Sequence, residues 1–252
     1  YKVAYYRCRE TGFIQTEEPY WLSEAYSSAI TKLDTGLVRR NIQLSESFSK
    51  IIATHFDKTA RFLDYAGGYG LFTRLMRDKG FDFYHHDPFC QNLFAEFFDS
   101  SKLEPVARYE LVTAMEVFEH LSKPKEEIEA LFQYSNSILF TTELQPAGNS
   151  NIQNWWYMGF EHGQHFSLYT KPALEHLAKL YGCNFYTNGS SIHLLTKKSF
   201  AQNPFAVLKD PFFTRKLKKL IRRSEQNRFR FPESLAEQDY NNIKASLNST
   251  LP

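Results

Sequence analysis

The most informative stretch of the chain reads Leu63-Asp64-Tyr65-Ala66-Gly67-Gly68-Tyr69-Gly70. It follows an apolar strand predicted over residues 61–65 and precedes a helix predicted over residues 71–79. An acidic residue at a strand end, followed by glycines and a helix start, is typical of a nucleotide-type site, because glycines let a ligand approach the backbone closely. No Lys-Ser or Lys-Thr pair follows, and the spacing does not meet G-x-G-x-x-G, so a P-loop and a dinucleotide site are disfavoured. The carboxylate of Asp64 suits a cationic or amine-bearing ligand better than a pyrophosphate.

Strands and helices alternate on both sides of this stretch. Strands separated by helices at this spacing indicate βαβ units and a mostly parallel sheet. The Asn188-Gly189 pair between the last two strands is a strong hairpin signal, so the sheet is expected to end in an antiparallel pair. The other predicted strands cover residues 81–86, 109–115, 138–142, 183–187 and 191–196, and the other predicted helices cover residues 45–56, 91–98, 124–134 and 172–182.

Asp87 ends the strand that follows the glycine stretch. An acidic residue about 20 residues after such a loop can bind both ribose hydroxyls of an adenosine ligand. The alternative is a turn aspartate that precedes Pro88. The glycine loop upstream favours ribose binding.

The glycine stretch, Asp87 and a later run together resemble class I S-adenosylmethionine-dependent methyltransferases. The later run is Glu116-Val117-Phe118-Glu119-His120-Leu121, and the resemblance covers residues 45–198. It implies a Rossmann-like, doubly wound α/β fold whose seven-stranded, mostly parallel sheet has an antiparallel last strand, with S-adenosyl-L-methionine as the cofactor. Asp87 would hold the ribose, whereas the adenine contact is left open because Asp99 is a poor candidate. The implied cofactor-binding residues are Asp64, Ala66, Gly67, Gly68, Gly70, Asp87 and Glu116.

Glu116, Glu119 and His120 form a second motif, at the end of the strand predicted over residues 109–115. Ligands bind at this edge of such sheets, and His120 could act as a general base with a pKa near working pH. In some related O-methyltransferases, such as ubiquinone-pathway and small-RNA enzymes, the Glu-x-x-Glu-His pattern holds a divalent cation, for which these side chains are suitable ligands. The residues leave open whether a cation binds or whether Glu119 and His120 cap a helix and orient the loop.

A third motif follows the strand predicted over residues 138–142 and a long loop. It reads Glu161-His162-Gly163-Gln164-His165-Phe166-Ser167. Long loops at such positions usually carry function. The run resembles the Glu-His-x-x-Tyr-Phe-Ser signature of deoxysugar C-methyltransferases, in which the histidine that matches His162 is the base; here His165 replaces the tyrosine. The candidate catalytic residues are therefore His165, His162 and His120, and the same histidines could instead meet a metal. The candidate substrate-binding residues in the preceding loop are Trp155, Trp156 and Tyr157.

Residues 1–44 are predicted to form a helical N-terminal lid over the cofactor and the acceptor. In this interpretation Arg40 meets the carboxylate of the cofactor and Tyr26 binds the substrate. Its other members are Trp21, Asp34 and Asn41. The alternative is a helical extension that only packs on the domain.

The run from Tyr5 to Gln15 resembles the second half of a zinc ribbon that precedes the methyltransferase domain in some sugar-modifying relatives. Cys8 is the only cysteine in it, and one cysteine cannot make a four-ligand zinc site. We therefore expect no structural zinc.

The composition is that of an ordinary globular protein. Its 252 residues include 30 Lys and Arg against 28 Asp and Glu, a formal net charge of +2 that argues against a general nucleic-acid binder. No stretch approaches the ~20 apolar residues that a membrane span needs. Three scattered cysteines do not make a disulfide framework, which favours a reducing, cytoplasmic compartment.

Residues 199–252 are predicted to form a basic helical tail beyond the methyltransferase domain at residues 45–198. Apolar residues at helical spacing accompany the basic ones. A solvated basic face is the alternative to a surface for an anionic substrate or partner, such as a phosphate-bearing acceptor. The basic residues are Arg215, Lys216, Lys218, Lys219, Arg222, Arg223, Arg228 and Arg230.

The sequence thus predicts a methyltransferase that acts on a small molecule, with a histidine as general base. The sugar-enzyme resemblance favours a hydroxyl of a sugar, nucleotide sugar or glycan as the acceptor. The alternatives are an RNA methyltransferase, an enzyme for another metabolite, or a non-catalytic scaffold that keeps the fold. The methylated atom and the oligomeric state are left open.

Overall fold

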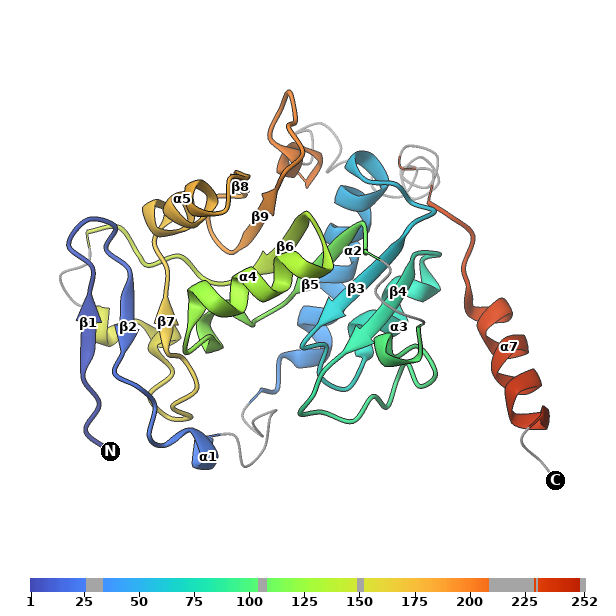
Figure 1. Ribbon diagram of the computed structural model, residues 1–252, viewed down its shortest axis with the longest axis horizontal. Helices are drawn as coiled ribbons and strands as arrows, with labels where there is room; N and C mark the ends of the chain where they lie inside the picture. The colour runs from blue at the N-terminus through green and yellow to red at the C-terminus, as the bar shows by residue number, and fades with distance from the viewer. Residues whose placement is uncertain (26–33, 104–107, 149–151, 209–228, 230, 250–252) are drawn as a thin grey trace, which may run out of the picture. The chain divides into compact units, whose positions relative to one another are not determined.

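The computed structural model describes residues 1–25, 34–103, 108–148, 152–208, 229 and 231–249 (Figure 1). The chain divides into two compact units. The first unit combines Tyr1–Asp34 with Leu111–Asn203, and the second unit combines Thr35–Glu110 with Pro204–Pro252.

Four strands of the first unit belong to the larger sheet, in the order β5-β6-β9-β8. Strands β5 and β6 are parallel, whereas β9 is antiparallel to both β6 and β8, so the hairpin predicted at Asn188-Gly189 is present. All residues of β5 and β6 are buried, as their apolar runs predict for strands covered on both faces. The bounds are β5 (Leu111–Ala114), β6 (Ser137–Thr141), β8 (Asn184–Thr187) and β9 (Ile192–Thr196), with helices α4 (Pro124–Tyr134) and α5 (Lys171–Leu180).

The N-terminal part of the first unit is a β-hairpin, where a helical lid was expected. Strands β1 (Tyr5–Arg7) and β2 (Ile14–Thr16) pair with each other, and β2 also pairs with β7 (Ser167–Leu168) in a separate antiparallel sheet (Figure 1). The hairpin is closed by a hydrogen bond from Cys8 N to Phe13 O (2.7 Å). Alternation explains the difference: Ile14 and Thr16 are buried while Gln15 is half-buried, which is the period of a strand. The described helical part is α1 (Leu22–Ala25).

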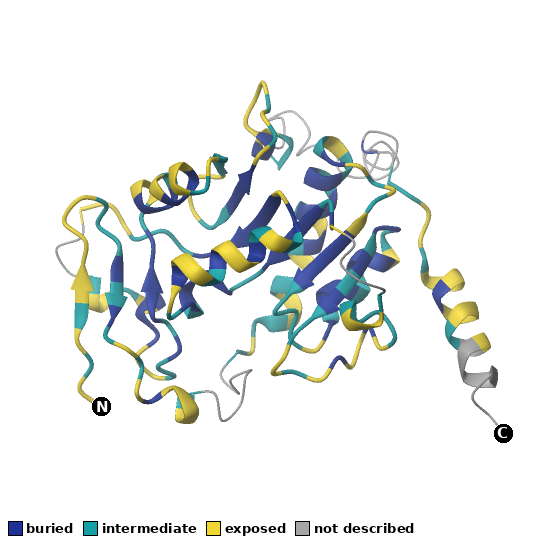
Figure 2. Ribbon diagram, in the orientation of Figure 1, coloured by how far each residue is buried: buried dark blue, intermediate teal, exposed yellow. Residues whose placement is uncertain are grey.

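The second unit is built on the parallel pair β3 (Arg61–Tyr65) and β4 (Asp82–His86), with α2 (Leu37–His55) and α3 (Leu71–Asp78). Helix α2 begins earlier than the predicted residue 45. Its buried face includes Phe48, Ile51 and Ile52, each worth about 1.5–3 kcal/mol of burial, and Figure 2 shows this face as dark blue. The remaining elements of the chain are α7 (Ala236–Ser249) and the 3-10 turns η1 (Ser100–Lys102), η2 (Phe118–His120), η3 (Ile152–Asn154), η4 (Trp156–Met158) and η5 (Pro204–Leu208).

The helix predicted over residues 91–98 is absent. Leu93 N and Phe94 N both donate to Tyr69 O, and the Asn92 side chain bonds the backbone of Ala95 through both its oxygen and its nitrogen. These bonds replace the helical pattern, as short polar side chains often do.

The larger sheet has six strands among the described residues, not the expected seven. Four lie in the first unit, and β3 and β4 lie in the second. Beside β4, a single parallel bridge joins His85 to Asp99, where a further strand would continue the pairing. The mostly parallel α/β fold is therefore confirmed, and the expected seventh strand is not found among the described residues.

Helix α7 is anchored to α3 by a buried carboxylate within the second unit. Asp239 receives two hydrogen bonds from Arg77 (2.9 and 2.8 Å) and one from Arg74 (2.9 Å).

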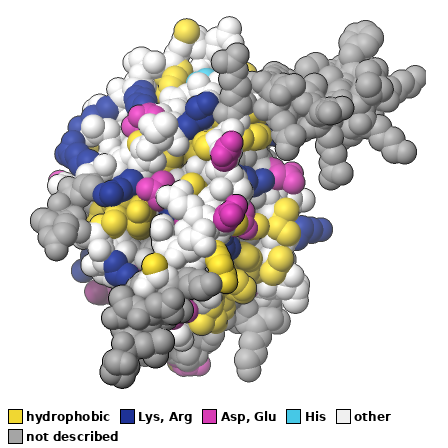
Figure 3. All heavy atoms as spheres, turned by 90° about the vertical axis from the view of Figure 1, so that its right-hand side faces the viewer, with side chains coloured by type: hydrophobic (Ala, Val, Ile, Leu, Met, Phe, Trp, Pro, Cys, Tyr) yellow, Lys and Arg dark blue, Asp and Glu magenta, His cyan; other side chains and the backbone are white. Residues whose placement is uncertain are grey.

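The predicted basic residues of the tail, from Arg215 to Arg230, lie outside the described residues. On the face shown in Figure 3, described Lys and Arg side chains lie among Asp and Glu side chains. None of the described helices is long and apolar enough to cross a membrane.

Candidate functional site

The glycine loop of the second unit, residues 66–70, joins β3 to α3 and is shaped by side chains beneath it. A β-carbon on Gly67 would lie 2.6 Å from Asp64 Oδ2 and 2.8 Å from His85 Cδ2. Gly70 has φ +81°, and a β-carbon there would lie 2.2 Å from Asn92 Oδ1. Only glycine fits at these two positions, because a β-carbon would overlap the side chains of Asp64, His85 and Asn92 on which the loop packs.

Asp64 is fully buried at the end of β3. Its Oδ2 accepts a hydrogen bond from the hydroxyl of Thr73 (2.9 Å), on the helix that follows the loop. This carboxylate therefore fixes the loop by joining its two flanking elements. Its predicted contact with a ligand stays a prediction.

Asp87 follows β4 and is bonded directly to the glycine loop. Its Oδ2 accepts from Gly68 N (2.9 Å), and its Oδ1 accepts from Phe89 N (2.8 Å) and Cys90 N (2.9 Å). The last two bonds form the turn considered in the sequence, and the first holds the carboxylate beside the loop. Both interpretations of Asp87 are thus compatible, because a half-buried carboxylate retains lone pairs for a ligand.

The predicted lid residues have different outcomes. Arg40 lies half-buried in the first turns of α2, in the second unit. Tyr26 lies outside the described residues. Trp21 is buried in the first unit, where its indole N–H donates to Gly163 O (2.7 Å) and so covers the histidine loop.

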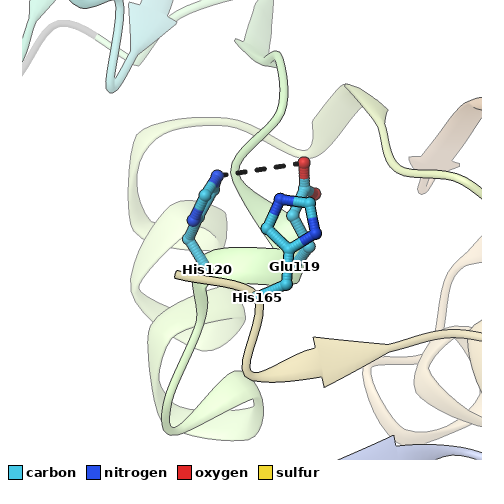
Figure 4. Close-up of side chains that lie close together, drawn as sticks. All are labelled: Glu119, His120 and His165. Carbon is cyan, nitrogen blue, oxygen red and sulfur yellow. Dashed lines mark ion pairs between the residues drawn. The ribbon is translucent and has the colours of Figure 1, made fainter. Parts of the chain in front are cut away.

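The first unit brings the predicted catalytic residues together. Glu119 and His120 lie on η2, directly after β5, and His165 lies just before β7 (Figure 4). His120 Nε2 is 4.0 Å from Glu119 Oε1, and ligand atoms of Glu119, His120 and His165 all lie within 4.8 Å of one another. We call these three residues the Glu-His-His cluster.

Glu119 is the unusual member of the cluster. Its carboxyl is fully buried, and neither oxygen has a hydrogen-bond partner among the described residues. The pKa of Glu119 is raised to about 8, mainly by burial and secondly by the nearby negative charge of Glu116. The side chains of Tyr157 and Thr142 act against this rise, but burial prevails. A buried carboxyl favours its neutral form unless a cation or a ligand donor lies beside it.

Both imidazoles of the cluster are held by backbone carbonyls. Nδ1 of His120 lies 2.9 Å from Gln164 O, and Nδ1 of His165 lies 2.6 Å from Tyr157 O. A carbonyl only accepts, so each Nδ1 carries the hydrogen and each Nε2 of the neutral ring carries a lone pair. Burial lowers the pKa of His120 to about 3 and that of His165 to about 4, so both rings are neutral at pH 7.

His162 lies next to the cluster but has the opposite tautomer. Its Nδ1 accepts from Gln164 N (3.2 Å), so the hydrogen of the neutral ring is on Nε2. The ring packs over Gly159, where a β-carbon would lie 2.5 Å from Nε2, and its centre is 4.7 Å from that of His165. Burial also lowers the pKa of His162.

Glu116 is tied to the end of the neighbouring strand. Its backbone N donates to Thr141 Oγ1 (2.8 Å), and that hydroxyl donates to Glu116 Oε1 (2.6 Å). The residue has φ +53°, an uncommon value for a side chain with a β-carbon and one that often marks functional sites. The pKa of Glu143 is raised, mainly by burial and secondly by the nearby negative charge of Glu116.

The three loop aromatics do not share one environment. Trp156 is 74% exposed, whereas Tyr157 is 2% exposed with its ring centre 4.6 Å from that of His165. Trp155 packs against the core cluster to which Tyr157, Ile14 and Leu168 belong. Tyr157 and Gln164 also supply the carbonyls that orient the histidines, a role that no motif in the sequence indicates.

Comparison with known proteins gives the class of this chain. The family described as "Methyltransferase domain" matches residues 38–188, which is more than half of the chain. The chain therefore belongs to this methyltransferase family. No curated protein matches it.

Solved structures agree in fold at low identity. The plantazolicin methyltransferase BpumL, described in complex with a substrate analogue and S-adenosylhomocysteine, has TM-score 0.50 and 14% identity over 80% of this chain and 88% of its own. Magnesium protoporphyrin IX methyltransferase from Synechocystis, also with S-adenosylhomocysteine, has TM-score 0.48 and 11% identity over 69% and 92%. CalO1, a methyltransferase of calicheamicin biosynthesis in its S-adenosylhomocysteine-bound form, has TM-score 0.44 and 14% identity over 69% and 60%.

These matches have limited reach. The chain covers 60% of CalO1 and 63% of an O-methyltransferase family protein from Burkholderia thailandensis. Identities this low show a shared fold. The S-adenosylhomocysteine bound to BpumL is consistent with S-adenosyl-L-methionine as the cofactor here.

Proposed function

We propose that this protein transfers a methyl group from S-adenosyl-L-methionine to a small-molecule acceptor. The observation that carries the proposal is the bond between Gly68 N and Asp87 Oδ2, which joins the glycine loop to the expected ribose acceptor in a chain of the methyltransferase family. When bound, the cofactor supplies an electrophilic methyl group on a sulfonium, which an acceptor lone pair attacks while the carbon–sulfur bond breaks.

The second unit is suited to bind the cofactor. The glycine loop is packed tightly on the side chains of Asp64, His85 and Asn92, and the Asp87 carboxylate is oriented by three backbone N–H groups. In the proposal Asp87 receives the ribose hydroxyls, and the loop from Ala66 to Gly70 lies along the methionine part. Asp64, Glu116 and Arg40 are proposed as further cofactor contacts.

The first unit is suited to accept the proton that the acceptor loses. His120 and His165 each have an Nε2 lone pair, and His162 does not, so we propose one of the first two as the base. A buried imidazolium is costly, as the low pKa values of both rings indicate. Glu119, whose Oε1 is 4.0 Å from His120 Nε2, would balance that charge in its ionised form, which burial disfavours at pH 7.

We propose a hydroxyl of a sugar, nucleotide sugar or glycan as the acceptor. The support for a sugar is the likeness of residues 161–167 to the deoxysugar C-methyltransferases, together with the exposed Trp156, whose ring suits the flat faces of sugars. That likeness does not choose a hydroxyl over a carbon atom. The acceptors named for the structural neighbours are of other kinds, and fold alone does not choose among them.

A second candidate chemistry is methyl transfer assisted by a divalent cation in the Glu-His-His cluster. Two imidazoles and a carboxylate are ligands for zinc-like and manganese-like ions, and a metal-binding histidine usually donates its other N–H to a carbonyl, as both histidines do here. The unpartnered oxygens of Glu119 support this alternative. Metal analysis of the purified protein, with Glu119→Gln as the comparison, distinguishes it from histidine-only chemistry.

The test of the proposed function is a calorimetric titration with S-adenosylhomocysteine, with and without a chelator. We expect one-to-one binding that Asp87→Ala abolishes and that Asp78→Ala, which removes an exposed carboxylate on α3, leaves unchanged. No binding by folded wild-type protein would contradict the proposal and favour a scaffold.

A further inference from the structure

The glycine loop of the second unit rests on two side chains that come from outside it and meet at one carboxylate. His85, on β4, is buried, and its Nε2 lies 2.9 Å from Gly68 O. Asn92 lies under the other end of the loop, where its Oδ1 fills the place of a β-carbon on Gly70. The two residues are therefore the supports of the loop at its middle and at its end.

Asp99 is the residue at which both supports converge. Its Oδ1 lies 3.4 Å from His85 Nδ1 and accepts from Asn92 Nδ2 (2.9 Å), and its Oδ2 lies 3.7 Å from Lys102 Nζ. The backbone holds it in place, because His85 N donates to Phe98 O (2.8 Å) and His85 and Asp99 form the single parallel bridge beside β4. The carboxylate is 28% exposed, so it keeps some contact with solvent.

The network reaches the expected ribose acceptor through one residue. Gly68 is held at its carbonyl by His85 Nε2–H and at its N–H by Asp87 Oδ2. A carbonyl must receive a hydrogen, so Nε2 of His85 carries one, and the Asp99 carboxylate holds the ring as its ion-pair partner where Nδ1 carries a hydrogen as well. A change at Asp99 therefore acts on the His85 ring, then on the Gly68 peptide, and then on the orientation of Asp87.

We propose that Asp99 is a positioning residue for cofactor binding, which holds the glycine loop in its binding shape through His85 and Asn92. The inference rests on the proposed function, since it assumes that this loop binds S-adenosyl-L-methionine. It assigns Asp99 a place behind the loop rather than against the adenine. The single parallel bridge between His85 and Asp99 brings this carboxylate beside the His85 ring.

The test measures S-adenosylhomocysteine affinity by calorimetry in the full chain. Asp99→Ala removes one of the two acceptors of Asn92 Nδ2 and the carboxylate beside His85 Nδ1, and we expect the Kd to rise about tenfold or more. Asp99→Asn keeps an acceptor oxygen and should restore most of the affinity. Asp78→Ala, the matched control on the exposed side of α3, should leave the Kd unchanged.

The coupling of the supports is tested by a double-mutant cycle. His85→Leu alone should weaken binding, and adding it to Asp99→Ala should cost far less than the sum, because both changes remove the same support. Loss of stability alone would lower the melting temperature and the binding-competent fraction, but not the Kd of the folded protein. If Asp99→Ala does not fold, Asp99→Asn and His85→Leu carry the test.

Three results are decisive. Equal Kd values for wild type, Asp99→Ala and His85→Leu overturn the inference while leaving the proposed function intact. Strict additivity in the cycle overturns the claim that Asp99 acts through His85. Wild-type protein that binds no S-adenosylhomocysteine overturns the proposed function itself, and the inference with it.

Discussion

The glycine loop of the second unit and the Glu-His-His cluster of the first unit use buried polar groups in opposite ways. Beneath the loop, Asp64, His85 and Asn92 each have a hydrogen-bond partner, and the loop shape follows from those bonds. In the cluster, Glu119 has none among the described residues, and two neutral imidazoles present lone pairs beside it. Satisfied buried groups fix a shape, whereas unsatisfied ones indicate a site that awaits a proton, a cation or a ligand.

The largest expected effect separates the three histidines. One of the two changes His165→Ala and His120→Ala should lower kcat by about 10²- to 10⁴-fold, because it removes the Nε2 lone pair of the proposed base. His162→Gln is the comparison, and we expect a loss below about tenfold because its Nε2 carries the hydrogen in the neutral ring. The measurement is release of S-adenosylhomocysteine with a nucleotide-sugar acceptor.

The affinity for S-adenosylhomocysteine should stay unchanged in all three histidine variants. An unchanged kcat in both His165→Ala and His120→Ala would exclude a histidine base in this cluster. A loss in His162→Gln alone would move the base to the residue that the deoxysugar signature indicates.

The next effect tests the rigidity of the loop with a matched pair of glycines. Gly70 and Gly148 have nearly the same backbone angle, φ +81° and φ +80°, but a β-carbon on Gly148 has nothing within 4 Å. Both changes to Ala pay the left-handed strain of about 1–2 kcal/mol, and only Gly70→Ala adds overlap with Asn92 Oδ1. We expect Gly70→Ala to lose about 2 kcal/mol more in urea unfolding and to bind S-adenosylhomocysteine more weakly. Equal losses would mean that Asn92 yields and the loop is not rigid.

A third prediction concerns the pH dependence that Glu119 gives to stability. Its pKa in the folded protein is raised to about 8, so the unfolded chain gives up that proton more readily, and the folded state loses stability as pH rises from about 4.5 to 8. Glu119→Gln removes this penalty. At pH 8 in chelated buffer the variant should exceed wild type by more than about 1.4 kcal/mol, the equivalent of one pKa unit.

The same pair of proteins should converge below pH 4.5, where the carboxyl is protonated in both states. The histidines act in the other direction: their lowered pKa values remove stability from both proteins as pH falls below about 6.5. If wild type is the more stable protein at pH 8 without metal, Glu119 is stabilised by a partner and the comparison of the two sites fails.

The sequence predicts the loop region well because its contacts are local. Asp64, the glycines and Asp87 lie within one strand–helix–strand unit, so their spacing alone brings them together. The helix over residues 91–98 is missed because a single side chain, that of Asn92, outcompetes the helical hydrogen bonds. The N-terminal hairpin is missed because β2 pairs not only with its sequence neighbour β1 but also with β7, more than a hundred residues later.

The cluster is predicted in part. Its histidines and glutamate are chemically conspicuous, but their tautomers depend on the carbonyls of Tyr157 and Gln164, which any residue could supply. Periodicity cannot indicate such backbone groups. It also cannot tell that Trp156 and Tyr157, adjacent in sequence, have opposite exposures.

The smallest expected effect uses that adjacent pair. Trp156 is 74% exposed, so Trp156→Ala should change the free energy of unfolding by less than about 0.5 kcal/mol. If its ring stacks on a sugar acceptor, the KM for a nucleotide sugar should rise several-fold while kcat and S-adenosylhomocysteine affinity stay constant. Tyr157→Ala should instead destabilise the protein by about 3–5 kcal/mol, because that ring is buried against His165. A change in kcat rather than in KM for Trp156→Ala would contradict a role in sugar binding alone. It would instead mean that the exposed indole affects the methyl-transfer step at the Glu-His-His cluster, against which the buried Tyr157 packs.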